Sequence, residues 1–377
     1  MLIEENVKEI FHTGKELKPL KHFKDTLKEK LRFLKKDNIY DEEDYKILKE
    51  IHQSIIKKNE LPFSLNRVEV NRIKNLEGNN SLLNYLIYRY KFDLYPKMKI
   101  VSKFPVYILI EPTSVCNLRC TMCFQADKTF TKKKYMGLMD FNLYKKIIDE
   151  AQNNGTQAIT LASRGEPTLH PKITEMINYA SNKFIDLKLN TNATKLNEKF
   201  IHKLLSSGLT EIVFSLDSDN KKQYEEIRVR GKWDEVYNNI KNFSHIKKKH
   251  YKNSKLHTRI SAVKFRKDQN IKKITSFWET LVDTVTFVKT HQRWDTYSNK
   301  PHPKMNHPCH YLWERMYIWY DGVCNPCDAD YKSYLKVGNF KNNKIKDIWH
   351  SEEFTKLRKK HLSKNRSQYN PCNRCGI

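Results

Sequence analysis

The sequence has few glycines, 10 in 377 residues, and far fewer acidic than basic side chains. No run of about 18 apolar residues occurs, which excludes a membrane-spanning helix among the predicted elements and a membrane as a partner. The first residues, Met1–Glu5, lack the pattern of a secretory signal, so we expect a cytoplasmic protein. A hydrophobic content of 39% with 12% aromatics predicts a globular chain, long enough for two or three domains.

Basic residues outnumber acidic ones by 70 to 43, which gives a formal net charge of +27. Clustered Lys and Arg neutralise phosphates in nucleic-acid-binding proteins. Lysine is here spread along the whole chain, so we interpret the charge mainly as compositional bias and do not expect a nucleic-acid partner. A basic surface also suits anionic substrates and acidic protein partners.

Eight cysteines without a secretory signal indicate metal binding rather than disulfides. Cys116, Cys120 and Cys123 follow the strand-like segment Val106–Ile110 at C-x3-C-x2-C spacing. Iron–sulfur clusters are ordinarily held by four thiolates, so three would leave one iron open to a ligand that is not protein. A zinc site with a distant histidine, or buried structural thiols, are the alternatives.

This motif, followed by Phe124, resembles the signature of the radical S-adenosylmethionine (radical SAM) superfamily. The resemblance implies that the open iron of a [4Fe-4S] cluster binds the amino and carboxylate groups of SAM, with Phe124 at the cofactor site. It also implies that an electron from the cluster cleaves SAM to a 5′-deoxyadenosyl radical.

Residues 97–300 show strand-like runs that alternate with helical periods, which predicts an α/β fold with a parallel sheet. The expected strands are Val106–Ile110, Ala158–Ala162, Asp186–Leu189, Ile212–Leu216, Thr258–Val263 and Thr284–Val288. The expected helices are Phe141–Ala151, Ile173–Ala180, Asn197–Leu205, Lys222–Phe243 and Ile271–Leu281. This order resembles the partial (β/α)6 barrel of the radical SAM family.

Two strand ends resemble parts of the family's cofactor site. Gly165 and Glu166 resemble the Gly-Gly-Glu element that receives the amino group of SAM, although Arg164 replaces the first glycine. Asn192 lies in a turn that resembles the family's Thr-Asn-Gly, with Ala193 where glycine is usual. A hydrogen-bonded turn without a cofactor role is the alternative for Asn192.

The next strand end supplies Ser215 and Asp217, which the resemblance implies reach the ribose hydroxyls of SAM. Beyond it, Arg228 best matches the arginine that pairs with the carboxylate of SAM, and Arg230 is a close rival. A guanidinium donates two parallel hydrogen bonds to a carboxylate. A solvated helix arginine is the alternative.

The last part of the chain holds five further cysteines around a predicted hairpin at Met316–Val323. The pattern C-x12-G-x4-C from Cys309 to Cys327 resembles the SPASM/twitch extension of radical SAM enzymes. The resemblance implies four ligands for one auxiliary [4Fe-4S] cluster: Cys309, Cys327, Cys372 and Cys375. Cys324 is left over as an idle thiol, an alternative ligand or a catalytic thiol near the substrate.

A zinc site built from four late cysteines is the rival interpretation. Its members would be Cys324, Cys327, Cys372 and Cys375. The gap between the two pairs is long for a zinc ribbon, and Cys309 would have no role.

Residues 1–96 show amphipathic helical periods, for example over Phe23–Leu34 and Tyr45–Ile55. We therefore expect three parts: a helical accessory domain at 1–96, a radical SAM core at 97–300 and a small cysteine-rich hairpin/helix domain at 301–377. Residues 1–96 have two possible roles: an accessory helical cap, or a module that docks a substrate or partner.

These features predict a radical SAM oxidoreductase that oxidises a small molecule such as a sugar, with the auxiliary cluster as electron acceptor. An acidic electron donor, flavodoxin or ferredoxin, suits the basic surface. A peptide-modifying maturase is the alternative. Such enzymes often carry an N-terminal winged-helix domain that binds the leader peptide, and the helical pattern of residues 1–96 fits that domain poorly. A basic zinc- or RNA-binding protein explains the charge but not the C-x3-C-x2-C loop.

Overall fold

The computed structural model describes residues 11–12, 40–58, 60–74, 76, 79–289, 295–301 and 306–375. The described residues fall into two compact units. The smaller unit contains the described residues between 40 and 102, and the larger contains residues 11–12 and those from 103 onward. The radical SAM-like segment and the late cysteines therefore share one unit.

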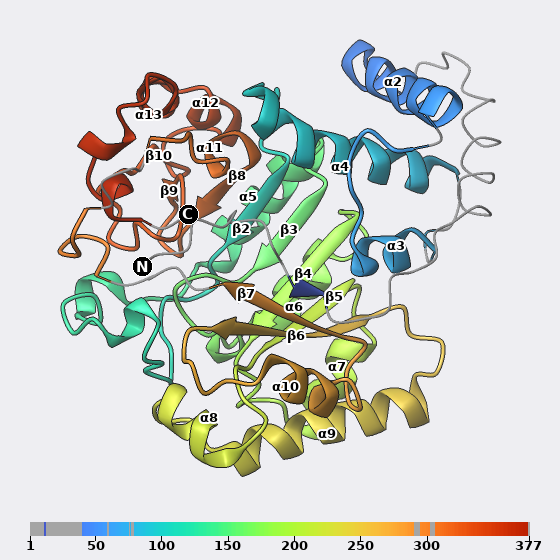
Figure 1. Cartoon of the computed structure of the whole chain (residues 1–377), viewed down its shortest axis with the longest axis vertical. Coiled ribbons are helices and arrows are strands. Elements are labelled where there is room, and N and C mark those ends of the chain that lie inside the picture. The colour runs from blue at the N-terminus through green and yellow to red at the C-terminus, as the bar shows by residue number, and fades with distance from the viewer. Residues whose placement is uncertain are drawn as a thin grey trace. The chain divides into compact units, whose positions relative to one another are not determined.

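A single ten-stranded sheet runs through the larger unit, in the order β1-β7-β6-β5-β4-β3-β2-β8-β9-β10 (Figure 1). Its centre consists of six consecutive parallel strands: β2 (Tyr107–Ile110), β3 (Ala158–Leu161), β4 (Asp186–Thr191), β5 (Glu211–Ser215), β6 (His257–Lys264) and β7 (Thr284–Lys289). Apolar residues of these strands are buried, as in parallel sheets covered by helices. The six predicted strands and the α/β fold are confirmed. Among the described residues the sheet is open, with β1 (Phe11–His12) and β10 (Gly338–Asn339) at its edges.

Helices connect the parallel strands: α5 (Phe141–Asn153), α6 (Ile173–Ala180), α7 (Glu198–Leu205), α8 (Lys221–Ile227), α9 (Trp233–His250) and α10 (Ile271–Trp278). Four of them begin at an Asp or Asn whose side chain accepts from backbone N–H groups of the first turn: Asp140, Asn197, Asn220 and Asn270. Such caps satisfy donors that have no partner within the helix. The helix starts therefore follow from local sequence.

The single helix expected over Lys222–Phe243 is wrong, because the chain breaks between α8 and α9. Arg230 has a φ of 75°, which a helix does not allow. The N–H of Gly231 donates to the carbonyl of Arg228 at 2.6 Å, and a Cβ at Gly231 would lie only 2.7 Å from that oxygen. A tight turn thus takes Arg228 out of the helix.

The cysteine-rich part extends the same sheet. The elements are α11 (Tyr311–Glu314), β8 (Arg315–Ile318), β9 (Val323–Asn325), β10, α12 (Ile345–Trp349) and α13 (Glu352–Leu362). Strand β8 runs parallel to β2, and β8, β9 and β10 pair antiparallel with one another in turn. The predicted hairpin is confirmed, with Gly322 at its turn in the left-handed region (φ 87°). Short 3-10 turns occupy Phe124–Ala126, Lys133–Tyr135, Pro167–Leu169, Arg366–Gln368 and Cys372–Arg374.

The smaller unit is helical where it is described, as predicted. Its helices are α2 (Glu42–Lys58), α3 (Arg67–Lys74) and α4 (Asn79–Met98). Helix α2 buries Leu48 and Ile51, and Tyr95 of α4 donates to the carboxylate of Glu43 at 2.6 Å. The helical run expected over Phe23–Leu34 lies outside the described residues.

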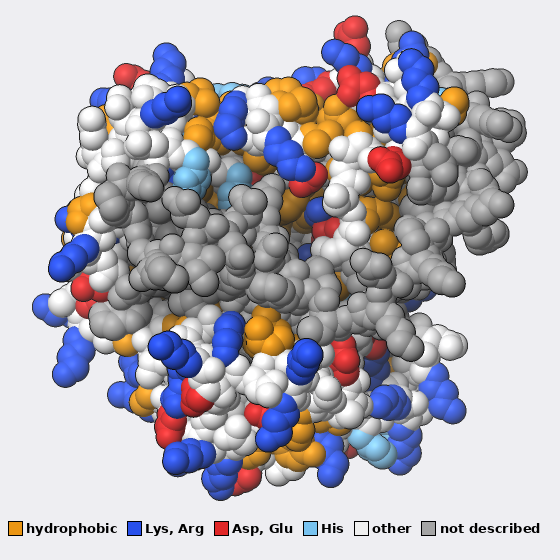
Figure 2. Space-filling model, viewed as in Figure 1, with side chains coloured by type: hydrophobic (Ala, Val, Ile, Leu, Met, Phe, Trp, Pro, Cys, Tyr) orange, Lys and Arg blue, Asp and Glu red, His pale blue; other side chains and the backbone are white. Residues whose placement is uncertain are grey.

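Two further features of the described residues concern apolar helices and the distribution of charge. None of the described helices combines the length and apolar character needed to cross a membrane. Lys and Arg side chains are spread over the face shown in Figure 2, and its described atoms form no single basic stripe. This distribution matches the even spread of lysine along the sequence.

A buried ion pair at the ends of two parallel strands contacts the cysteine-rich part. Arg164, after β3, donates from Nε and Nη2 to Glu111, after β2, at 2.7 and 2.6 Å. Both side chains are at most 3% exposed. Arg164 also donates from Nη1 to the carbonyl of Tyr331 at 2.9 Å and stacks 4.2 Å from the ring centre of Trp319. The arginine that departs from the family's glycine thus contacts both cysteine-bearing regions.

We predict that Arg164→Ala strongly destabilises the full chain, because Glu111 then remains buried and charged without its partner. Breaking a buried pair costs about 3–5 kcal/mol. Denaturant unfolding of the anaerobically prepared protein measures the loss. Lys221→Ala, which breaks the exposed pair with Asp234, serves as the control and should leave the midpoint unchanged. A loss below about 1 kcal/mol for Arg164→Ala, the range of surface pairs, would contradict the role of this pair.

Candidate functional site

The loop after β2, residues 111–126, holds the first three cysteines and is called the cysteine loop below. Each thiol accepts an N–H hydrogen bond: Cys116 from the Leu118 backbone (3.4 Å), Cys123 from the Gln125 backbone (3.5 Å) and Cys120 from the Arg228 guanidinium (3.6 Å). Burial and nearby Glu166 raise the pKa of Cys116, and the neighbouring thiols Cys123 and Cys120 add to this effect. The three thiols therefore lie near enough to interact electrostatically, and each has a donor that stabilises thiolate charge, which fits a three-ligand iron–sulfur site.

Backbone and side-chain contacts fix the cysteine loop against two neighbouring turns. The loop N–H groups of Arg119 and Thr121 donate to the carbonyls of Val229 and Ile227, at 2.9 and 3.0 Å. On its other side, Asn117 accepts from the side chain of Asn192 and donates to that of Thr194, each at 2.9 Å. The loop is thus held by the turns after α8 and β4.

Gly165 and Glu166 pack against the cysteine loop, where the Glu166 N–H donates to the Val115 carbonyl at 2.9 Å, and their contact with SAM stays a prediction. A Cβ at Gly165 would lie 2.2 Å from the Thr113 carbonyl oxygen, so only glycine fits. The buried Glu166 accepts from Thr191 Oγ1 at 2.7 Å and from the Asn192 N–H at 2.6 Å. Burial, the largest effect, raises its pKa, whereas these hydrogen bonds lower it. Among the described residues, the Asn192 N–H provides the single hydrogen bond to Oε2, which leaves capacity at this oxygen for an ammonium group.

Asn192 uses its side chain to hold the turn. Its Oδ1 accepts from the N–H and the hydroxyl of Thr194 at 3.0 and 2.8 Å. Ala193 has a φ of 63°, which explains why the family prefers glycine at this place. The geometry therefore supports a positioning role for Asn192, and direct contact with SAM stays a prediction.

Arg228 lies at the cysteine loop, whereas Arg230 is exposed. The Nε of Arg228 donates to Asp217 at 2.6 Å, and the other oxygen of Asp217 accepts from the Val263 N–H at 2.8 Å. Burial, the largest single effect, lowers the pKa of Arg228, but Asp217, Cys120 and Tyr224 together raise it above its usual value. Ser215 is half-buried at the end of β5. The structure brings Asp217 and Arg228 together as a pair, so Asp217 orients the guanidinium here.

Phe124 is buried in an aromatic cluster. Its ring stacks on Tyr331 at 5.1 Å and meets Phe130 edge-on at 5.7 Å. The Tyr331 hydroxyl donates to Asp127 at 2.8 Å. Sequence reasoning missed Tyr331 and Asp127, because no local pattern links residues 204 positions apart. Contact of Phe124 with SAM stays a prediction.

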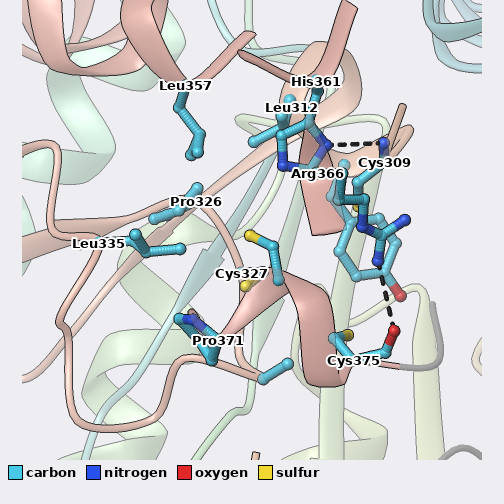
Figure 3. Close-up of a pocket in the computed structure, with 13 residues that line it drawn as sticks. Cys309, Leu312, Pro326, Cys327, Leu335, Leu357, His361, Arg366, Pro371 and Cys375 are labelled. Carbon is cyan, nitrogen blue, oxygen red and sulfur yellow. Dashed lines mark hydrogen bonds between the residues drawn. The ribbon is translucent and has the colours of Figure 1, made fainter. Parts of the chain in front are cut away.

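A second thiol site, the C-terminal pocket, lies in the cysteine-rich part (Figure 3). Its lining consists of four cysteines, Cys309, Cys327, Cys372 and Cys375, together with Tyr311, Leu312, Pro326, Ala329, Leu335, Leu357, His361, Arg366 and Pro371. Burial and Asp330 raise the pKa of Cys327 well above its usual value, and the other three thiols add to this effect. These cysteines are the four that the resemblance implied as auxiliary-cluster ligands. Four gathered thiols in an apolar lining fit a fully ligated iron–sulfur cluster.

Cys324 lies apart from the C-terminal pocket. It is fully buried in β9, and its thiol donates to the carbonyl of Gly322 at 3.6 Å. The zinc set that requires Cys324 is therefore not brought together, whereas Cys309 joins the pocket. A catalytic role for Cys324 stays a prediction, and its burial favours the idle thiol.

Two segments of the chain match known protein families, and they contain the two thiol sites. Residues 110–275 match the radical SAM superfamily, and residues 309–376 match an iron–sulfur cluster-binding domain, SPASM. The chain therefore belongs to the radical SAM superfamily and carries a C-terminal SPASM domain. Its cofactors are SAM, a SAM-binding [4Fe-4S] cluster and an auxiliary iron–sulfur cluster.

Several known proteins are similar to this chain. A tungsten-containing aldehyde ferredoxin oxidoreductase cofactor-modifying protein of Pyrococcus furiosus is 34% identical over 112 residues, 29% of this chain and 30% of the relative. Mycofactocin maturase MftC of Mycolicibacterium smegmatis is 25% identical over 155 residues, 40% of this chain and 38% of the relative. Among solved structures, Streptococcus suis SuiB bound to SAM has a TM-score of 0.55 at 18% identity, covering 85% of this chain and 84% of SuiB. SuiB supports the fold alone, and the chain spans well under half the length of both curated relatives.

We predict that reconstituted protein carries roughly eight irons, enough for two [4Fe-4S] clusters. Replacing Cys116, Cys120 and Cys123 together by Ala should halve the iron and abolish SAM cleavage. Cys327→Ser should also lose half, whereas Cys324→Ser should keep all of it. Iron and acid-labile sulfide analysis measures this. Loss of iron in Cys324→Ser but not in Cys327→Ser would reverse the ligand assignment, and stoichiometric zinc without sulfide would overturn it.

We predict that Arg228→Ala weakens SAM binding, because a carboxylate loses its charged partner. Hydrogen bonds to charged groups contribute about 1.5–3 kcal/mol, which is a loss of roughly 10- to 150-fold in affinity. Equilibrium binding of SAM to the reconstituted protein measures the effect. The matched control is Arg230→Ala, which should bind normally since that side chain is exposed. If Arg230→Ala weakened SAM binding and Arg228→Ala did not, Arg230 would be the partner of the SAM carboxylate.

Proposed function

We propose that this protein is a radical SAM maturase that oxidises a peptide substrate. The observation that carries the proposal is the similarity to mycofactocin maturase MftC across 40% of this chain. SuiB, whose fold is similar, has been solved bound to the precursor peptide SuiA. These relatives favour a peptide over the sugar expected from the sequence.

The chain's own residues support the binding of SAM beside the cysteine loop. Glu166 Oε2 can accept an ammonium group, and Arg228 can donate to a carboxylate while Asp217 holds its Nε. Phe124, Phe130 and Tyr331 form a buried aromatic cluster that packs against Cys123 and keeps water from this side of the cysteine loop. Such exclusion protects a reactive species from side reactions.

The C-terminal pocket supports a role in electron transfer rather than in substrate binding. When bound, SAM with its cluster supplies a radical that removes one hydrogen atom, and the auxiliary cluster supplies an acceptor for the next electron. The four cysteines of the pocket leave no iron position for a substrate atom. The substrate would lose a hydrogen atom, a proton and an electron, which is a two-electron oxidation.

The electron donor that reduces the first cluster is an acidic protein such as a flavodoxin or ferredoxin in this proposal. The net charge of +27 supports it, because opposite charges speed the encounter of redox partners. Association should therefore weaken as salt concentration rises.

We predict that the reduced protein, supplied with SAM, converts a peptide from a panel of candidate substrates into a product that lacks two hydrogen atoms. One 5′-deoxyadenosine should form per product, because one hydrogen atom passes to SAM's adenosyl group. Mass spectrometry of peptide and nucleoside measures both. The control is the protein with Cys116, Cys120 and Cys123 replaced by Ala, which should form neither. Oxidation of a sugar alcohol from a parallel panel, with every peptide unchanged, would reject the peptide and restore the small-molecule oxidoreductase.

A further inference from the structure

His361 is a buried histidine on the wall of the C-terminal pocket. It lies in the last turn of α13, is 1% exposed and lines the pocket together with the four cysteines. The backbone N–H of Cys309 donates to its Nδ1 at 3.1 Å, as the dashed line in Figure 3 shows. The imidazole is therefore fixed in orientation by a cysteine of the pocket.

This hydrogen bond determines which ring nitrogen carries a proton. A neutral imidazole has one N–H, and a nitrogen that accepts a hydrogen bond cannot be the one that donates. Because Nδ1 accepts from Cys309, the proton of the neutral ring lies on Nε2. Nε2 is buried and has no hydrogen-bond partner among the described residues. Buried N–H donors in native proteins are rarely left without an acceptor, so this one indicates an acceptor that the described part of the chain does not provide.

We propose that the Nε2–H group of His361 donates a hydrogen bond to a sulfur of the auxiliary iron–sulfur cluster and thereby raises the cluster's reduction potential. A donor to a cluster sulfur stabilises the reduced, more negative form more than the oxidised form. The proposal deepens the proposed function and rests on it, since an electron acceptor works better at a higher potential. His361 acts as a positioning and tuning residue, because it does not contact the reacting atoms.

The same geometry excludes His361 as an iron ligand. Ligation by Nε2 would need its lone pair, but that nitrogen carries the proton while Nδ1 accepts from Cys309. The four cysteines already supply a complete set of ligands. The ring therefore acts through its N–H group.

The surroundings strengthen such a hydrogen bond. The pocket wall beside His361 is apolar, with Leu312 and Leu357 among its lining residues. Electrostatic interactions weaken less in an apolar environment than in water. Arg366, 1% exposed, donates to the carbonyl of Cys375 at 3.5 Å and adds a buried positive charge on the same wall. Asp330, near Cys327, opposes it.

The test measures the auxiliary cluster by itself, in full-length protein whose Cys116, Cys120 and Cys123 are replaced by Ala. EPR-monitored redox titration compares His361 with His361→Asn and His361→Gln in this background. Asn places an amide oxygen near Nδ1 and keeps the acceptor for Cys309, but has no donor near Nε2. Gln places its amide nitrogen near Nε2 and keeps the donor. We expect reduction to become about tenfold less favourable in His361→Asn, which is about 59 mV for one electron, and to stay near the parent value in His361→Gln.

An unchanged potential in His361→Asn, or an equal fall in both variants, would overturn the proposal. Pulsed EPR of the parent protein with 15N-labelled histidine covers the case in which a variant loses its cluster. A weak magnetic coupling between the 15N nucleus and the reduced cluster, absent in unlabelled protein, supports the N–H donor. A strong coupling would mean that histidine ligates iron, and no coupling would mean that it does not contact the cluster; either result overturns the proposal. Neither measurement uses a substrate. The inference about His361 can therefore fail while the peptide product forms, and it can hold while no peptide product forms.

Discussion

The buried ion pair between Glu111 and Arg164 is the contact on which the arrangement of the two thiol sites depends. Glu111 is the first residue of the cysteine loop, and Arg164 directly precedes Gly165 and Glu166 in the sequence. Arg164 also donates to the Tyr331 carbonyl, and Glu111 accepts from the Tyr320 N–H at 3.2 Å. Charges removed from water need such complete pairing, so alternative arrangements of these segments cost free energy. Together with the pairing of β2 and β8, this ion pair holds the first thiol site and the cysteine-rich part in one geometry.

The strand ends show how a parallel sheet assembles a site from short local motifs. Loops that leave the same edge of the sheet converge, although they are distant in sequence. The cysteine loop is tied by backbone hydrogen bonds to the turn that carries Arg228, and by side-chain amides to the turn after β4. The residues that contact one another are therefore positioned by the sheet, while their chemistry comes from the individual loops.

Local patterns made much of this predictable from the sequence. The buried strands, the capped helices and the spacing of Cys116, Cys120 and Cys123 each depend on neighbouring residues. The break at Arg228 was missed, because a positive φ at Arg230 is rare for a side chain with a Cβ. Contacts between distant segments were missed as well, since Arg164 and Tyr331 are 167 positions apart. His361 likewise becomes notable only when folding brings it to Cys309.

Strand β8 lies parallel to β2 in the same sheet, so the SPASM domain of this chain is not a separable attachment. A transplant of this domain onto another barrel would have to bring a strand that completes the β2 edge. It would also have to place a backbone carbonyl, as Tyr331 does here, within hydrogen-bond reach of the Arg164 guanidinium. Recombination of such domains is therefore limited to barrels that already match the graft at both places. A change at this shared sheet edge therefore affects both cluster domains at once.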